Sequence, residues 1–182
     1  MIKYAFVMNV PGECPDTYSI TYEDEGSLNL VVGTGNMEMA EDLIKKLAKE
    51  GFVWVDLCGD FDDAITAKLS DATEGKVRLL HADYLPLELQ KLNALEDLTE
   101  YGVIIKADDD VDVQYFELKS NECNAYIAFA KDIDDAGKAA KRLMVKGVAF
   151  IELCGWFDKE KTEMIIEAIE GKVPVGTCGS LS

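Results

Sequence analysis

The sequence predicts an α/β fold built from two pseudo-symmetric repeats. The segment Gly51–Asp62 recurs as Gly147–Asp158, a spacing of 96 residues, and the match continues without a gap to Val77 and Val173. Short apolar runs of strand length alternate with stretches of helical spacing in both halves. Each half therefore reads β-β-β-α-β-α-β, and the β-α-β-α-β ends favour mostly parallel strands joined by right-handed crossovers. We expect the two halves to pack together.

The first repeat is expected to span residues 1–85. Its apolar runs predict strands at Tyr4–Val10, Tyr18–Tyr22, Leu28–Val32, Phe52–Leu57 and Val77–Leu80. Helical spacing of apolar residues predicts helices at Met37–Glu50 and Asp62–Thr73. Gly51 follows the first helix directly, where a glycine commonly ends a helix.

The second repeat is expected to span residues 101–182 and to follow the same order. Strands are predicted at Val103–Lys106, Val113–Leu118, Ala125–Ala130, Val148–Leu153 and Val173–Gly176. Helices are predicted at Ala136–Lys146 and Lys159–Ile169. Residues 86–100 are expected to connect the repeats through a helix at Pro86–Leu98, because proline suits the first turn of a helix.

Composition excludes several classes of function. The net charge is −17, from 18 basic and 35 acidic residues, and no basic cluster appears that would neutralise phosphates. We therefore expect no nucleic-acid partner and no attachment to an anionic membrane. No apolar run reaches the length of about 18 residues that a membrane span needs. The five cysteines include no CxxC pair, which is typical of a cytoplasmic protein with reduced thiols.

An acidic residue interrupts the same strand in both repeats. Because side chains alternate between the faces of a strand, Trp54, Asp56 and Cys58 share one face. Phe150, Glu152 and Cys154 repeat this order 96 residues later. Burial of a carboxylate is costly unless it is hydrogen-bonded or paired, yet both repeats keep an acid here.

Three interpretations of this acid remain open. In the first, the acid accepts hydrogen bonds from backbone N–H groups or lies at a solvent-exposed edge. Alternatively, the faces line a ligand cleft at the carboxyl ends of the strands, where open α/β sheets bind ligands. In the third interpretation, Asp56 and Glu152 approach across the pseudo-two-fold axis and share a proton, which makes one of them a general acid.

The turns that follow these strands supply the candidate ligand contacts. A helix N-terminus would lower the pKa of Cys58 and Cys154, whereas the neighbouring carboxylate would raise it, so structural thiols are favoured over nucleophiles. Asp60 and Trp156 occupy the same position of the repeat, and an exposed Trp156 would offer a stacking surface. The predicted ligand-binding residues are Cys58, Gly59, Asp60, Lys131, Cys154, Gly155 and Trp156. Gly59 and Gly155 would permit the tight turns, and Asp62 and Asp158 are expected N-caps.

No metal or cofactor is expected. His81 is the only histidine, which argues against a zinc site, although it would serve once as a base or ligand contact. The acidic run at residues 108–112 lacks the glycine and glutamate of an EF-hand loop, so a solvated turn is expected there. Gly33–Asn36 resembles a phosphate loop, but Glu38 stands where the third glycine of a dinucleotide motif belongs.

The second half resembles a family of short bacterial proteins known only as a domain of unknown function. The resemblance rests on Ile151–Phe157 and Gly171–Gly176, whereas the first half has Arg78–Leu80 in place of the Pro-Val-Gly ending. No activity is assigned to that family, so the resemblance implies the fold. It also implies that single-repeat relatives dimerise to form what this chain forms by duplication.

Three hypotheses for function follow. The leading one is a protein that binds a small metabolite near the two Cys-Gly turns. The second is an enzyme that uses Asp56, Glu152 or His81 as the catalytic group for proton transfer. The third is a structural or partner-binding protein without a ligand. The chain is expected to be a monomer with a pseudo-two-fold axis or a homodimer.

Overall fold

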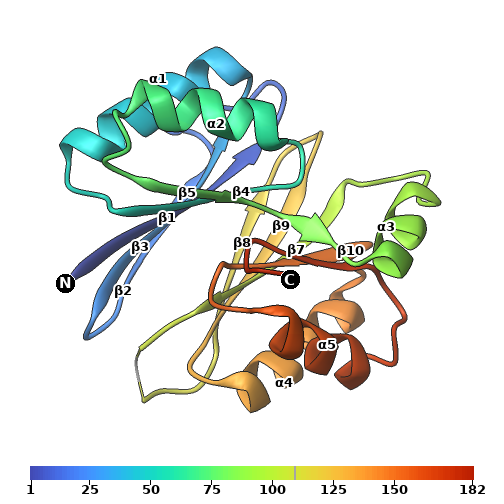
Figure 1. The fold of residues 1–182 in the computed structure, drawn as a ribbon. Coiled ribbons are helices and arrows are strands. Elements are labelled where there is room, and N and C mark those ends of the chain that lie inside the picture. Colours follow the sequence, from blue (N-terminus) through green and yellow to red (C-terminus); the bar gives the residue numbers. More distant parts are fainter. Residues whose placement is uncertain (109) are drawn as a thin grey trace. The chain divides into compact units, whose positions relative to one another are not determined.

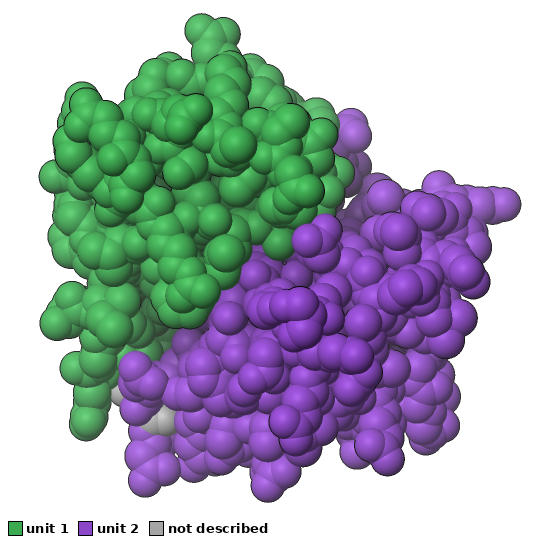
Figure 2. All heavy atoms as spheres, in the orientation of Figure 1, with its two compact units in different colours: residues 1–81 green, residues 82–182 purple. Residues whose placement is uncertain are grey.

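A computed structural model describes residues 1–108 and 110–182 and divides them into two compact units. The first unit is Met1–His81 and the second is Ala82–Ser182, coloured separately in Figure 2. Each unit holds one mostly parallel sheet with helices packed on it, which confirms the predicted α/β class (Figure 1). Asp109, within the predicted acidic turn, lies outside the described residues.

The first unit has five strands and two helices among its described residues. The sheet has the order β2-β3-β1-β4-β5, with only β2 antiparallel to its neighbour. The strands are β1 (Ile2–Asn9), β2 (Ser19–Glu23), β3 (Ser27–Thr34), β4 (Trp54–Leu57) and β5 (Arg78–His81). The helices are α1 (Met37–Lys49) and α2 (Asp63–Ala72). The predicted order β-β-β-α-β-α-β is confirmed for this repeat.

The second unit repeats this plan and adds a strand at one edge. Its sheet order is β8-β9-β7-β10-β11-β6, and β6 pairs antiparallel with β11. The repeated elements are β7 (Glu100–Lys106), β8 (Gln114–Lys119), β9 (Asn124–Ala130), α4 (Ile133–Lys146), β10 (Phe150–Leu153), α5 (Lys159–Ala168) and β11 (Val175–Thr177). The additional elements, which come first in the chain, are β6 (Asp83–Tyr84) and α3 (Pro86–Asn93). The second repeat therefore also keeps the predicted order.

Local sequence explains where the helices begin and end. The carboxylates of Asp62 and Asp158 accept hydrogen bonds from the backbone N–H groups of Ile65 and Lys161, at 2.8 and 3.0 Å. Both residues are thus the predicted N-caps of α2 and α5, and they satisfy N–H groups that the helix itself leaves unpaired. At the other end, Gly147 closes α4 with φ of 94°, a conformation that favours glycine.

The core of each unit lies on the central parallel strands. The side chains of Ala5, Phe6 and Val7 in β1 are all fully buried, as are Val103 and Ile104 in β7. Continuous apolar runs are typical of parallel strands with both faces covered, which is why these segments lack a clear alternation. No helix among the described residues is long and apolar enough to cross a membrane.

The segment expected to connect the repeats is built into the second unit. Within α3, the carboxylate of Glu88 is 2 % exposed and accepts a hydrogen bond from the backbone N–H of Val175 at 2.9 Å. Lys91 donates to Glu88 at 2.5 Å and to the carbonyl oxygen of Gly171 at 3.0 Å. A buried carboxylate held in this way fixes α3 to β11, so this segment is part of a folded unit.

Candidate functional site

The acid of the first repeat is completely buried and accepts hydrogen bonds from aromatic side chains. Asp56 lies on β4 and has 0 % exposure. The Tyr4 hydroxyl donates to one carboxylate oxygen at 2.8 Å, and the Trp54 indole N–H donates to the other at 2.7 Å. Tyr4 pairs with Trp54 in the register of β1 and β4, so the sheet itself brings the donors to the acid.

The acid of the second repeat has a related but different arrangement. Glu152 on β10 is 2 % exposed. The hydroxyl of Tyr101, which occupies the place of Tyr4 in the register, donates to one carboxylate oxygen. The Tyr84 hydroxyl donates to the other oxygen at 2.7 Å. Tyr84 comes from β6, which the first unit lacks.

The two repeats use different donors for the second carboxylate oxygen. Phe150 replaces Trp54 at the matched position and stacks on Tyr101 at 4.7 Å between ring centroids, but it has no N–H to donate. Tyr84 supplies the missing donor. Its ring lies directly over Gly176, where a Cβ atom would stand 2.5 Å from the ring carbon that bears the hydroxyl. The first repeat has Leu80 at that position, a residue with a larger side chain than glycine.

These hydrogen bonds explain how the two acids are accommodated in the interior of the folded chain. Both oxygens of each carboxylate accept hydrogen bonds within their own unit, which offsets the desolvation that burial imposes. A ligand would reach Asp56 or Glu152 only after the side chains around it moved. The two acids belong to different units, and the hypothesis that they share a proton stays a prediction.

Both predicted thiols are buried at the ends of their strands. Cys58 is 6 % exposed and Cys154 is 3 % exposed. The sulfur atom of Cys58 accepts a hydrogen bond from the backbone N–H of Asn9 at 3.4 Å, and that of Cys154 accepts one from Lys106 at 3.3 Å. This repeated geometry fits thiols that pack against the neighbouring strand, as buried cysteines usually do.

The carboxyl edge of the first sheet carries acids and the single histidine. Asp60 is exposed in the turn after Gly59, and Asn9 donates to it at 3.2 Å. His81 ends β5, and its Nε2 atom lies 2.8 Å from a carboxylate oxygen of Asp63. The structure thus places Cys58, Gly59, Asp60 and His81 at the same edge of one sheet.

The carboxyl edge of the second sheet carries cations around a tryptophan. Trp156 is partly exposed in the turn after Cys154 and Gly155. The ammonium groups of Lys106 and Lys161 lie 5.8 and 5.0 Å from the centre of its ring, within the range of cation–π attraction. The predicted ligand-binding residues include one lysine, Lys131, whereas the fold also brings Lys106 from β7 and Lys161 from α5 to the ring of Trp156.

Each of these lysines has an acidic partner. Lys106 pairs with Asp108 at 2.7 Å, and Lys161 pairs with Asp158 at 2.6 Å. Lys131 pairs with Asp110 at 3.0 Å, and this hydrogen bond raises the pKa of the Lys131 ammonium group. The described residues hold no group of three or more metal-ligating side chains.

Sequence reasoning missed the hydrogen-bond donors of both acids. A signal existed for Tyr4 and Tyr101, because a tyrosine opens the first strand of both repeats at nearly the repeat spacing. Nothing in the sequence pointed to Tyr84, since its contact depends on the pairing of a two-residue strand with β11.

The fold defines a duplicated α/β protein. Each repeat has one buried carboxylate that accepts hydrogen bonds from aromatic side chains. A family model matches the chain twice, over residues 2–97 and 99–180. The chain belongs to this family, the family of unknown function DUF6506. No curated protein matches the sequence.

Several solved structures share a distant likeness with the chain. An unliganded arylmalonate decarboxylase is 14 % identical, with a TM-score of 0.35 over 98 % of this chain and 88 % of the other. An ABC transporter solute-binding protein from Conexibacter woesei is 12 % identical, with a TM-score of 0.33 over 96 % of this chain and 69 % of the other. Likeness at this level indicates nothing about ligand or reaction.

Proposed function

We propose that the chain binds a small anionic metabolite at the carboxyl edge of the second sheet, beside the Cys154-Gly155 turn. The observation that carries this proposal is the indole of Trp156 with the ammonium groups of Lys106 and Lys161 within 6 Å of its centre. An apolar surface bordered by cations suits a ligand with an apolar body and negative groups.

The first repeat supports this assignment by contrast. Its residues at the positions of Lys106, Lys131, Trp156 and Lys161 are, in that order, Asn9, Gly35, Asp60 and Ile65. None of these is a cation, and one is an acid. Both repeats need the same turns to fold, so folding alone does not account for three lysines and a tryptophan at one edge of a chain with net charge −17.

The acidic partners of the lysines restrict the ligand further. A bound anion must compete with Asp108 for Lys106 and with Asp158 for Lys161. A ligand with two negative groups replaces both contacts at once, which favours dicarboxylates or phosphorylated metabolites over monoanions. Because these pairs are partly exposed, added salt is expected to weaken binding.

Thermal unfolding with succinate, citrate and glucose 6-phosphate tests the proposal. A ligand present at about 100 times its Kd stabilises the native state by about 2.7 kcal/mol, which raises the unfolding temperature measurably. Trp156→Ala and Lys161→Ala should remove the shift, whereas Asp60→Ala at the matched edge of the first sheet should preserve it. A shift that survives both variants of the second repeat would contradict the proposal, as would the absence of any shift with these anions.

A second candidate function is proton transfer by His81. It is favoured by the hydrogen-bond distance of 2.8 Å between His81 and Asp63, because a carboxylate on one ring nitrogen orients an imidazole for acid–base work. Exchange of carbon-bound hydrogen in D2O, followed by NMR for a panel of keto acids and amino acids, measures this activity. His81→Gln should abolish any exchange, and exchange that persists in that variant would exclude the histidine as the base.

A further inference from the structure

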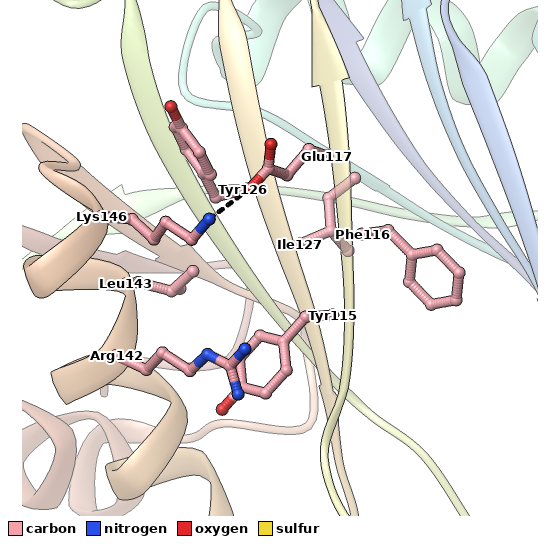
Figure 3. A pocket seen from close by; sticks show the side chains of 8 residues that line it. All are labelled: Tyr115, Phe116, Glu117, Tyr126, Ile127, Arg142, Leu143 and Lys146. Carbon is pink, nitrogen blue, oxygen red and sulfur yellow. Dashed lines mark hydrogen bonds and ion pairs between the residues drawn. The ribbon is translucent and has the colours of Figure 1, made fainter.

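A concave surface lies between α4 and the strands β8 and β9 of the second unit (Figure 3). It encloses a volume of about 260 Å³. The side chains that matter here are Tyr115, Glu117, Tyr126, Arg142, Leu143 and Lys146. All come from three elements of the same unit, so the groove is complete within it.

Arg142 is the unusual member of this groove. Its guanidinium carbon lies 4.0 Å from the centre of the Tyr115 ring, and no carboxylate among the described residues pairs with it. Stacking on a ring uses the flat face of the guanidinium and leaves the N–H groups at its edge for a planar acceptor. One end of the groove is therefore formed by the positively charged guanidinium group of Arg142, which lies against the ring of Tyr115.

The rest of the lining differs from this end. One helical turn along α4, Lys146 pairs with Glu117 at 2.8 Å, and Lys119 pairs with the other oxygen of the same carboxylate at 3.3 Å. The buried side chain of Leu143 lies between Arg142 and Lys146 along the helix face (Figure 3). Tyr126 adds an aromatic ring, and a hydrogen bond to Glu100 raises the pKa of its hydroxyl. The groove thus has a cationic end without a carboxylate partner among the described residues, an apolar middle and a polar end whose charges are ion-paired.

The first repeat shows that folding does not require this lining. At the position of Arg142 it has Lys46, which pairs with Glu50 one turn later at 3.9 Å. The second repeat has cations at both of these positions, although like charges four residues apart destabilise a helix slightly. The matched positions of Tyr115 and Tyr126 are Ser19 and Leu30, so both tyrosine rings are also specific to the second repeat.

We propose that this groove is a binding site for a small aromatic carboxylate. The carboxylate accepts two parallel hydrogen bonds from the edge of Arg142, and the ring of the ligand lies on Leu143 and against Tyr126. A polar substituent on the ring would meet the Lys146–Glu117 pair. The volume of 260 Å³ lies just below the range of about 300–1,000 Å³ for ordinary ligand pockets, which favours a ligand with a single ring.

This site is distinct from the carboxyl edge proposed above. Helix α4 starts at that edge with Asp132 as its N-cap, and Arg142 and Lys146 lie in its last turns, at the other end of the sheet. The ligand class also differs, since a stacked arginine suits one planar carboxylate and separated lysines suit a ligand with two negative groups.

Isothermal titration with benzoate tests the inference, with benzamide as the uncharged ligand of the same shape. Benzoate should bind, and benzamide should bind about tenfold more weakly or not at all. Arg142→Gln should weaken benzoate binding by about tenfold or more, the usual effect of losing hydrogen bonds to a charged group. Tyr115→Ser, which installs the residue of the first repeat, should also weaken it.

Matched variants decide where the ligand sits. Lys46→Gln, at the equivalent position of the first repeat, and Trp156→Ala, at the carboxyl edge, should leave benzoate affinity unchanged. The inference is overturned if benzoate at millimolar concentration produces no binding heat, if Arg142→Gln binds as tightly as the natural chain, or if Trp156→Ala alone abolishes binding. Arg142 is exposed, and far-UV circular dichroism checks that its variant folds.

Discussion

A methyl group added at Gly176 should break the hydrogen bond between Tyr84 and Glu152. The Cβ atom of Gly176→Ala would stand 2.5 Å from the ring carbon that bears the Tyr84 hydroxyl and 2.7 Å from the two adjacent ring carbons. Carbon atoms pack at about 3.5–4.0 Å, so the ring must retreat by about 1 Å. The hydroxyl, now 2.7 Å from the carboxylate oxygen, would then lie beyond hydrogen-bond distance.

The loss of free energy follows from this geometry. A hydrogen bond to a carboxylate contributes about 1.5–3 kcal/mol, and overpacking of a core adds about 1–3 kcal/mol. Because the ring moves to relieve part of the clash, we expect Gly176→Ala to lower the free energy of unfolding by about 2–4 kcal/mol. Urea denaturation followed by circular dichroism measures this change. In a Trp54→Phe background, fluorescence of Trp156 reports on the second unit alone.

A double-mutant cycle identifies the cause. In a Tyr84→Ala background the ring is gone, so Gly176→Ala should lower the free energy of unfolding by less than about 1 kcal/mol, with a coupling energy of at least about 1 kcal/mol. Gly137→Ala in α4 provides the control, because its Cβ atom would meet the Cβ atom of Ala168 in α5 at an ordinary 3.5 Å. That variant should stabilise the chain by about 0.5–1 kcal/mol. Equal effects of Gly176→Ala with and without Tyr84 would refute the reasoning.

Two further predictions concern single side chains. Tyr4→Phe removes one donor from the buried acid of the first repeat, and the free energy of unfolding should fall by about 1.5–3 kcal/mol in the same urea assay. A hydrogen bond between the Thr17 hydroxyl and the Cys14 sulfur lowers the pKa of the Cys14 thiol, so Cys14 should form thiolate and react with iodoacetamide at lower pH than an ordinary cysteine. Peptide mass spectrometry should show that Thr17→Val moves this profile to higher pH, whereas Cys58 and Cys154 resist alkylation until the chain unfolds. Rapid labelling of either buried thiol in the native protein would contradict their packing.

The elements that could be predicted are those encoded by local pattern. The repeat spacing aligned two sets of apolar runs, and helical spacing in Met37–Glu50 located α1 to within one residue of its end. Strand β6 could not be found in this way, because two residues carry no periodicity. It exists because it pairs with β11, and strand order is a property of the whole chain.

The candidate site likewise has one part that local sequence pattern predicts and another that depends on strand order. The acids at Asp56 and Glu152 stood out because a charge interrupted an apolar strand at the repeat spacing. The hydrogen-bond donors of these acids did not stand out, since a donor such as Tyr84 is brought to its acid only by the order of the strands in the sheet. The cations around Trp156 were also underestimated, because Lys106 is 50 residues away in sequence and meets the ring only in the folded sheet.

The boundary between the two family matches and the boundary between the two folded units fall at different places in the chain. The first family match runs to residue 97, yet residues 82–97 fold as part of the second unit and supply Tyr84 and Glu88 to it. A gene split at the boundary between the two copies would leave Glu152 without one donor and the backbone N–H of Val175 without its acceptor. Separation of the two copies at residue 97 should therefore destabilise the second unit, because that unit depends on side chains from the end of the first copy.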